Sequence, residues 1–370
     1  MAATVRITRD GHLHLITPDP VSGAATGPSV LDGDPNVDVA VLEVAGGHLT
    51  WSVLAPAAPP VAVLDDADLA QEWVWAVYGE RVAPALADGG GVVDGTEPAL
   101  PALAESARRL AYAHWAARWW PASVIDSIPP LDERLLDREI AELTEACDPL
   151  FAGRDDPADT AFGAAVDIDI EHPLPRPGDY ALTAGPGAPG TPADALTLAR
   201  GTGGSDWRRC PPGLVDASER AVSWEVVRAA ARTTVLVQVV AAPGPPLADR
   251  RLTPRAAVSG VADPLDIGLR RVADAWLGDA RVRGVESVPG TGMAVDVYLP
   301  GFGPPVRPGP GDRPPTDRVT TDRLTSDRLT RERIRDLARA RLAGARNGST
   351  AGHGPPLLAE IAAASDDTDF

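Results

Sequence analysis

The residues whose types and spacing could do chemistry lie mainly in one stretch, 167–172 (DIDIEH). In an extended strand every second side chain points to the same face, so Asp167, Asp169 and Glu171 would share a face, with His172 just beyond. Carboxylate oxygens in this arrangement suit a divalent cation such as Mg²⁺ or Mn²⁺. The stretch therefore indicates a metal site, which a hydrolase or transferase could use.

The same stretch also fits an edge strand without metal. Ile168 and Ile170 would then point inward, while the acidic side chains face solvent and protect the edge from aggregation. No second cluster with metal-ligand spacing accompanies it. We therefore expect no cofactor and keep Mg²⁺ or Mn²⁺ as the alternative.

Other patterns that resemble functional motifs do not indicate a catalytic site. The segment 185–190 (GPGAPG) matches G-x-G-x-x-G, but its prolines remove amides that would face a pyrophosphate, and no βαβ unit surrounds it. His12 and His14 flank Leu13 in the first hairpin and could chelate a metal from one strand face, but two histidines beside a turn are more often surface residues. Cys147 and Cys210 are too far apart for a Cys-x-x-Cys site and indicate two reduced thiols. No catalytic residue is predicted.

The chain contains no lysine, so its 34 basic residues are all arginine. A P-loop, a pyridoxal Schiff base and a protein kinase each need a lysine, and these classes are excluded. Asparagine is also rare, while alanine, glycine, proline and arginine are abundant, which is typical of GC-rich coding. We therefore expect a bacterial protein from a GC-rich genome.

The formal charge of -18 disfavours nucleic acid and anionic membranes as partners of the whole molecule, because both repel an acidic surface. Hydrophobic residues make up 44% of the chain, enough for globular cores. The start of the chain lacks the apolar run of a signal peptide, and no stretch approaches the length of a membrane span. These features predict a cytoplasmic protein.

The elements that would position these residues begin with β-hairpins. Alternating apolar residues on either side of Asp10-Gly11, and again around Gly46-Gly47, predict two hairpins. Helical spacing follows, with a helix predicted over 132–147. Residues 1–152 thus indicate an α+β domain of antiparallel hairpins and helices.

A connector is expected at 153–212, acidic at first and then rich in proline and glycine. Six short apolar segments separated by turn residues follow it. Their spacing is typical of a β-sandwich, which we place at 213–303.

The C-terminal part is predicted to be helical and partly disordered. Residues 304–330 contain a five-residue repeat and indicate a linker, because a step of five scatters apolar residues around a helix. Residues 331–370 comprise a basic amphipathic helix and an acidic tail. Residues 307–346 carry eleven arginines and six acids, a net charge of +5, whereas residues 1–306 carry 23 and 42, a net charge of -19.

Two features indicate an interaction surface. Trp119 and Trp120 are neighbours that point about 100° apart on a helix, so one of them is expected to be exposed as an interface anchor. The basic helix offers four further candidate residues: Arg335, Leu337, Arg339 and Leu342.

The sequence therefore predicts an α+β domain, a sandwich-like domain and a helical tail. We expect a non-catalytic adaptor that acts through protein–protein contacts, its basic helix docking on a partner or on its own acidic body. The alternative is the metal-dependent hydrolase or transferase.

Overall fold

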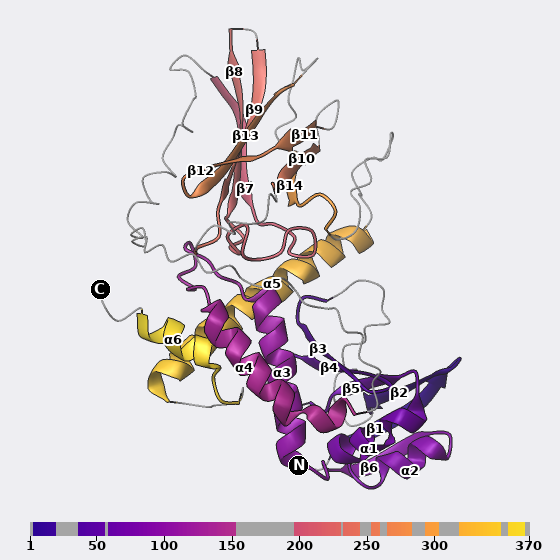
Figure 1. Ribbon diagram of the computed structural model, residues 1–370. Helices are drawn as coiled ribbons and strands as arrows, with labels where there is room; N and C mark the ends of the chain where they lie inside the picture. Colours follow the sequence, from indigo (N-terminus) through magenta and orange to yellow (C-terminus); the bar gives the residue numbers. More distant parts are fainter. Residues whose placement is uncertain are drawn as a thin grey trace. The chain divides into compact units, whose positions relative to one another are not determined.

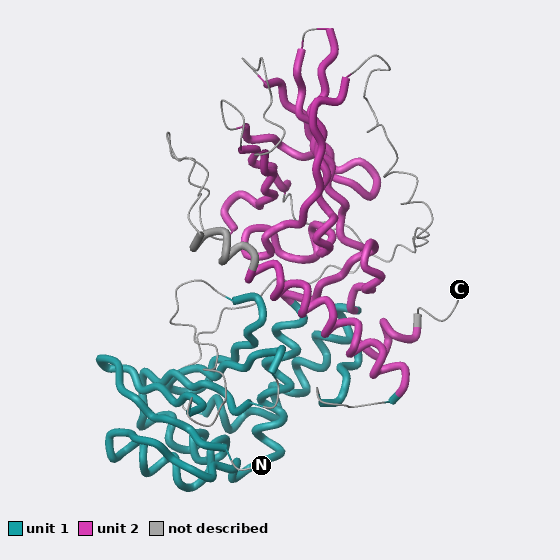
Figure 2. The backbone as a smooth tube through the Cα atoms, turned by 180° about the vertical axis from the view of Figure 1, so that it is seen from behind, with its two compact units in different colours: residues 1–117, 132–175, 348–359 teal, residues 118–131, 176–347, 360–370 magenta. Residues whose placement is uncertain are grey.

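The computed structural model divides the chain into two compact units, coloured separately in Figure 2. Unit 1 comprises residues 1–117, 132–175 and 348–359, and unit 2 comprises residues 118–131, 176–347 and 360–370. The structure describes the following residues: 3–19, 36–55, 58–152, 196–230, 232–244, 253–259, 265–282, 293–302, 318–348 and 354–366.

Unit 1 contains the two predicted hairpins (Figure 1). Strand β1 (Ala3–Asp10) pairs antiparallel with β2 (Leu13–Pro18), and Gly11 in their turn has a φ of +61°. Strand β3 (Val39–Val44) pairs in the same way with β4 (Gly47–Ser52). Both turns confirm the expectation drawn from their glycines.

These hairpins belong to a six-stranded sheet with the order β3-β4-β5-β2-β1-β6. Strand β5 (Val61–Leu64) is buried along its whole length and joins the hairpins at the centre of the sheet. Strand β6 (Gly91–Thr96) pairs with β1 at the edge. The sequence analysis did not predict this strand, because the glycines at its start hide the short Val92-Val93 strand signal.

The helices of unit 1 follow the sheet in the sequence. Helix α1 (Ala67–Tyr78) begins at Asp66, whose side chain accepts the amides of Asp68 and Leu69, each at 3.0 Å. The other helices are α2 (Val82–Ala87), α3 (Pro101–Trp119), α4 (Glu133–Ala146) and the 3₁₀ turn η2 (Asp148–Leu150). Helix α4 confirms the prediction over 132–147, with Asp132 as its N-cap.

Two buried tryptophans fasten helices of unit 1 to the hairpin region. The Trp73 indole Nε1 on α1 donates to the carbonyl of Ala45 at 2.6 Å. The Trp115 indole Nε1 on α3 donates to the carbonyl of Val37 at 2.8 Å. Burial of each ring therefore comes with a satisfied N–H group, as a buried tryptophan requires.

Unit 2 holds two further antiparallel sheets (Figure 1). The five-stranded sheet has the order β12-β13-β9-β8-β7, and the three-stranded sheet has the order β11-β10-β14. The strands are β7 (Leu196–Gly203), β8 (Val222–Ala229), β9 (Arg232–Val240), β10 (Arg255–Ser259), β11 (Leu265–Gly268), β12 (Arg270–Val272), β13 (Ala275–Val282) and β14 (Ala294–Tyr298).

One hydrophobic core is shared by these two sheets. Val235, Val237 and Val239 alternate with half-buried residues along the central strand β9 and point into this core. Val258 and Val297 contribute to it from the three-stranded sheet. Alternating strands of this kind have one buried face, which fixes their register.

The strands of unit 2 differ from the expected segments in two places. Strand β7 lies inside the expected connector at 153–212, where proline and glycine on either side obscure a short polar strand. One of the six apolar segments expected to be strands, 265–272, instead forms β11 and β12 in two different sheets. Gly268, which ends β11, stands where the chain leaves one sheet for the other.

Helices α5 (Arg318–Asn347) and α6 (Leu358–Asp366) complete the described chain. Helix α5 starts within the expected linker at 304–330. The repeats contain neither glycine nor proline after residue 315, and arginine and leucine favour helix, so the helix continues through them. The repeat's scattered apolar residues do not prevent helix formation.

The described residues thus have mixed α+β content, with antiparallel pairing in all three sheets and six α-helices, as predicted. Within these residues, no helix combines the length and apolar character needed to cross a membrane.

Candidate interaction site

Helix α5 presents a row of charged side chains to the loops of unit 2. We call this row the arginine ladder; it consists of Asp327, Arg331, Arg335 and Arg339, and every member has an ion-pair partner outside the helix. A spacing of four residues places side chains on neighbouring turns of one helix face. The ladder is therefore one continuous polar face about four turns long.

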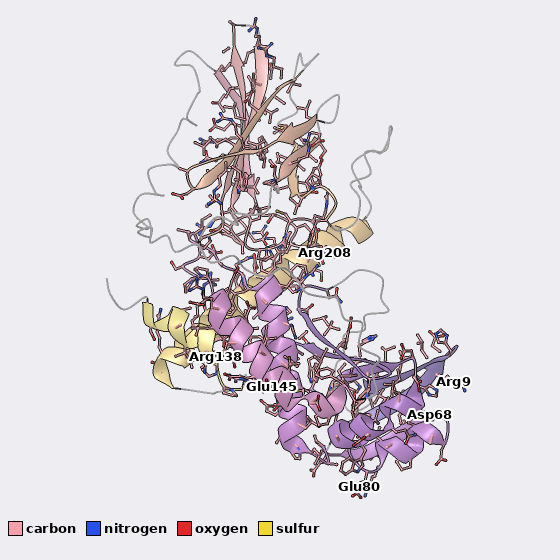
Figure 3. All side chains as sticks on the ribbon, in the orientation of Figure 1. Arg9, Asp68, Glu80, Arg138, Glu145 and Arg208 are labelled. Atoms are coloured by element: carbon pink, nitrogen blue, oxygen red, sulfur yellow. The ribbon has the colours of Figure 1, made fainter. Side chains whose placement is uncertain are left out.

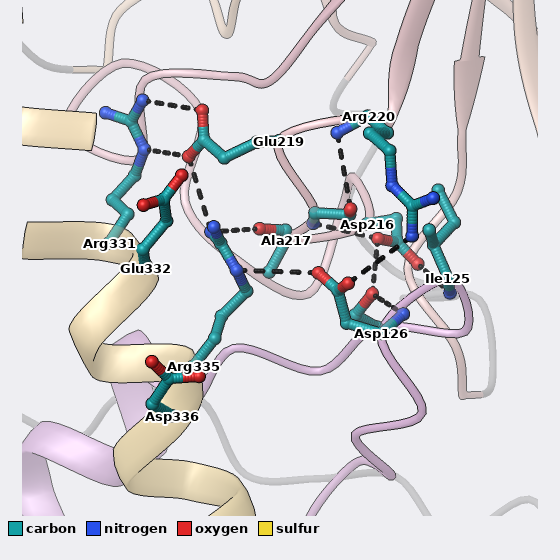
Figure 4. A network of polar contacts seen from close by, with 12 residues as sticks. Ile125, Asp126, Asp216, Ala217, Glu219, Arg220, Arg331, Glu332, Arg335 and Asp336 are labelled. Atoms are coloured by element: carbon teal, nitrogen blue, oxygen red, sulfur yellow. Dashed lines mark hydrogen bonds and ion pairs between the residues drawn. The ribbon is translucent and has the colours of Figure 1, made fainter. Parts of the chain in front are cut away.

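Arg335 is the most enclosed member of the ladder, with only 4% of its surface exposed. Its Nη1 donates to the carbonyl of Ala217 at 3.1 Å and to Glu219 Oε1 at 3.3 Å, and its Nε lies 3.4 Å from Asp126 Oδ2. Figure 4 shows Arg335 reaching both acidic loops. A buried guanidinium is costly unless it is paired, and here it has three partners.

The Glu219 carboxylate pairs with two members of the ladder, Arg331 and Arg335. It accepts from Arg331 through Nε at 2.7 Å and Nη2 at 3.1 Å, the two-pronged geometry that favours arginine over lysine (Figure 4). The same carboxylate also accepts from Arg335. Both Arg331 and Glu219 are nearly buried, so solvent screens this contact less than an ordinary surface pair.

Asp126 serves as the second acidic partner. Its carboxylate lies 3.4 Å from Arg339 Nη2 and 3.7 Å from Arg220 Nη2, in addition to the contact with Arg335. The Asp126 carbonyl also accepts from Arg339 Nε at 3.4 Å. One aspartate is therefore surrounded by three guanidinium groups.

A buried carboxylate, Asp216, holds the two acidic loops together. It accepts from Ser123 Oγ and the Val124 amide, each at 2.7 Å, and from the Ser218 amide at 2.9 Å. Asp216 is completely buried. Burial raises the pKa of Asp216, and these hydrogen bonds lower it in part. Asp216 thus holds in place the two loops that carry Asp126 and Glu219.

The ladder ends at Asp327, which pairs with Arg208. Arg208 is labelled in Figure 3. Arg208 also lies 3.2 Å from Asp206 through Nε. The polarity is reversed here, because the helix supplies the acid and the loop supplies the arginine. Reversed polarity at one end favours a single register of α5 against the loops.

No known protein family matches this chain, and neither a curated protein nor a solved structure was found that matches it.

The prediction that Trp119 or Trp120 would be exposed was wrong. Both are buried, with 7% and 6% of their surfaces exposed. Helix α3 ends at Trp119, so the two rings enter different surroundings: Arg118 lies over the Trp119 ring at 5.2 Å, while Trp120 Nε1 donates to the Pro129 carbonyl at 2.9 Å. The bend after α3 removes the helical divergence on which the prediction depended.

The other predicted interaction residues lie on α5. Leu337 and Leu342 are buried, as is Arg335, whereas the Arg339 side chain is 43% exposed. The ladder brings Arg335 and Arg339 together on Asp126. The two leucines pack in the interior from the same helix.

The proposed metal ligands Asp167, Asp169, Glu171 and His172 lie outside the described residues, and the metal hypothesis stays a prediction. Within the described ranges, no group of three or more His, Cys, Asp or Glu residues could hold a metal ion. Cys147 and Cys210 are both free and buried.

Sequence reasoning missed Asp126, Asp216 and Glu219, the acidic half of the site. A weak signal existed for Asp216, because an aspartate two residues before a serine is typical of a turn in which the side chain accepts a backbone amide. Nothing local indicated that Glu219 would meet Arg331, since 112 positions separate them.

Proposed function

We propose that this protein is a non-catalytic adaptor that works through protein–protein contacts, with α5 as its docking element. In the resting chain the acidic loops of unit 2 occupy the arginine ladder. The observation that carries the proposal is the burial of Arg335 between Ala217, Glu219 and Asp126. An arginine committed in this way is typical of a specific helix-docking contact.

The chemistry of α5 supports exchange with a partner. Released from the loops, the helix would present the ladder together with apolar residues that are buried in the folded chain, which include Ile334, Leu337 and Leu342. Helices of this kind bind in grooves of other proteins through residues at helical spacing. A competing partner would need acidic groups spaced as Asp126 and Glu219 are.

We also propose a β-sandwich as the scaffold of unit 2. The five-stranded and three-stranded sheets share one core, which supports face-to-face packing. As part of the same proposal we place the protein in the cytoplasm, where two free cysteines would stay reduced.

The test compares full-length wild type with Arg335→Glu and with Arg333→Glu. Arg333 is exposed on the same helix and outside the ladder, so it controls for charge reversal. Hydrogen exchange followed by mass spectrometry should show faster exchange along 331–342 in Arg335→Glu alone. Slow exchange there in both variants would contradict ladder docking.

The adaptor function needs its own readout. Each form, together with a 1–306 truncation, serves as bait in extracts of the native host, with bound proteins quantified by mass spectrometry. We expect a stoichiometric partner that Arg335→Glu binds differently from Arg333→Glu and that the truncation loses. A partner bound equally by all four baits would exclude α5 as the docking element.

A further inference from the structure

Helices α3 and α4 of unit 1 hold a short piece of chain, residues 354–359, through its backbone. Arg109 on α3 donates to the carbonyls of Pro355 and Pro356, from Nη1 and Nη2 respectively, each at 2.9 Å. Glu139 on α4 accepts the amide of Leu358 at 2.7 Å. Two carbonyls and one amide of four consecutive residues are therefore recognised.

The two recognising side chains also fix each other. Arg109 Nε donates to Glu139 Oε1 at 2.8 Å, and only 4% of the Glu139 surface is exposed. A buried carboxylate is costly unless it is paired. Glu139 is paired with Arg109, which also contacts the segment, and with the Leu358 amide of the segment itself. The pair is thus a built binding element that contacts the backbone leading into α6 through both carbonyls and an amide.

The side chains of the segment complete the fit. Leu357 and Ala359 are fully buried, while Leu358 between them is 38% exposed. Pro355 and Pro356 have no amide to leave unsatisfied, and their fixed φ lowers the entropy lost on docking. Gly354 has a φ of +71°, and a Cβ there would lie 2.5 Å from Arg108 Nη2. The required pattern is Gly-Pro-Pro-Leu followed by a tolerant position.

We propose that the surface around Arg109 and Glu139 is a peptide-binding site for Gly-Pro-Pro-Leu-Leu segments. The chain's own residues 354–358 fill it, and a partner protein with the same motif competes for it. All recognised groups come from one contiguous segment, whose Pro355 lies 246 positions from Arg109. A ligand of this kind can be supplied by a second molecule, with the tethered copy favoured by its high local concentration.

The experiment uses a fluorescent peptide of residues 352–359 (GHGPPLLA) and full-length protein, with binding followed by anisotropy. Leu357→Asp places a charge at the buried position and should release the resident segment. It should bind the peptide at least tenfold more tightly than wild type or Leu358→Asp, the control at the exposed neighbour. Adding Glu139→Gln to Leu357→Asp should weaken peptide binding at least tenfold.

Two results would overturn the proposal. One is the absence of peptide binding by a folded Leu357→Asp variant, with folding judged by circular dichroism. The other is equal binding with and without Glu139→Gln, since the peptide would then bind elsewhere. If Leu357→Asp does not fold, Leu357→Ala replaces it, and exchange of the Leu358 amide reports whether the segment has left. The same criteria then apply.

Discussion

At the scale of single residues, buried charge in this protein is matched by several partners at once. Arg335 and Asp216 each have at least three polar contacts, and neither depends on a single neighbour. Removing one side of such a network leaves the other side buried and poorly solvated. The cost of a substitution therefore depends on what remains behind.

Arg335→Ala should lower the free energy of unfolding by about 2 kcal/mol, because Glu219 and Asp126 lose a buried partner. The loss stays moderate, since Arg331 and Arg339 still neutralise these acids. Urea unfolding measures it. Arg333→Ala, at the exposed control position, should change the value by less than about 0.5 kcal/mol. Equal losses in both variants would contradict the geometry described for Arg335.

The buried cysteines give a prediction for alkaline pH. Burial raises the pKa of Cys210 to about 12 and that of Cys147 to about 11, from an ordinary value of 9.0. Between pH 9 and these values the unfolded chain releases thiol protons that the folded chain keeps. Folding stability should therefore fall as pH rises through this window.

Urea unfolding at pH 8 and at pH 10.5 tests this dependence. The stability lost between the two pH values should be smaller in Cys210→Ala than in wild type, because the variant lacks one shifted thiol. An identical loss in both proteins would mean that the Cys210 thiolate is not penalised by burial.

At the scale of elements, local chemistry decides where helices and turns begin. The Asp66 side chain accepts two amides at the start of α1, and Ala45 and Gly46 form the turn between β3 and β4. At Gly46, whose φ is +70°, a Cβ would collide with the Asp66 carbonyl. The start of α1 and the hairpin turn therefore depend on each other.

Asp66→Ala should lower the free energy of unfolding by about 1 kcal/mol, because two amides at the start of α1 lose their acceptor. Thermal or urea unfolding measures the change. Gln71→Ala, in the middle of the same helix, serves as the control and should be nearly neutral. A neutral Asp66→Ala would show that water replaces the cap without loss.

Local signals of this kind explain which elements could be predicted from the sequence. Asp10-Gly11 and Asp132 carry their turn and cap chemistry in one or two residues, and both predictions were confirmed. Strand β6 was not predicted, because its pairing with β1 outweighs a weak local pattern. The start of α5 was not predicted, because the helix continues through the repeats despite their scattered apolar residues. The ladder's acidic partners could not be predicted, because a contact such as Arg335 with Glu219 spans 116 positions.

At the scale of the whole molecule, opposite charges are divided between the α5 region and the rest of the chain. Residues 307–346 carry +5 and residues 1–306 carry -19. Long-range attraction between opposite charges favours docking of such a helix and depends on salt. Because the ladder arginines are paired, they are poorly available to anionic polymers.

Wild type should therefore pass through a heparin column at about 0.15 M salt, a condition that leaves a Debye length of about 8 Å. A variant with Asp126→Asn and Glu219→Gln removes the loop carboxylates that pair with four arginines and should be retained; these arginines are Arg220, Arg331, Arg335 and Arg339. The control, Asp68→Asn with Glu72→Gln, changes net charge equally at exposed positions of α1. Equal retention of both variants would mean that net charge alone governs binding.

The alternation of buried and half-buried residues along β9 limits where the gene tolerates the insertion or deletion of a codon. Val235, Val237 and Val239 all face the core from the middle strand of the five-stranded sheet. Loss or gain of one codon within β9 would turn these valines outward and bring Leu236 and Gln238 inward, reversing the face of every following position. Changes in codon number are accommodated in the connecting loops, so related sequences should differ in length between strands and keep β9 at nine residues.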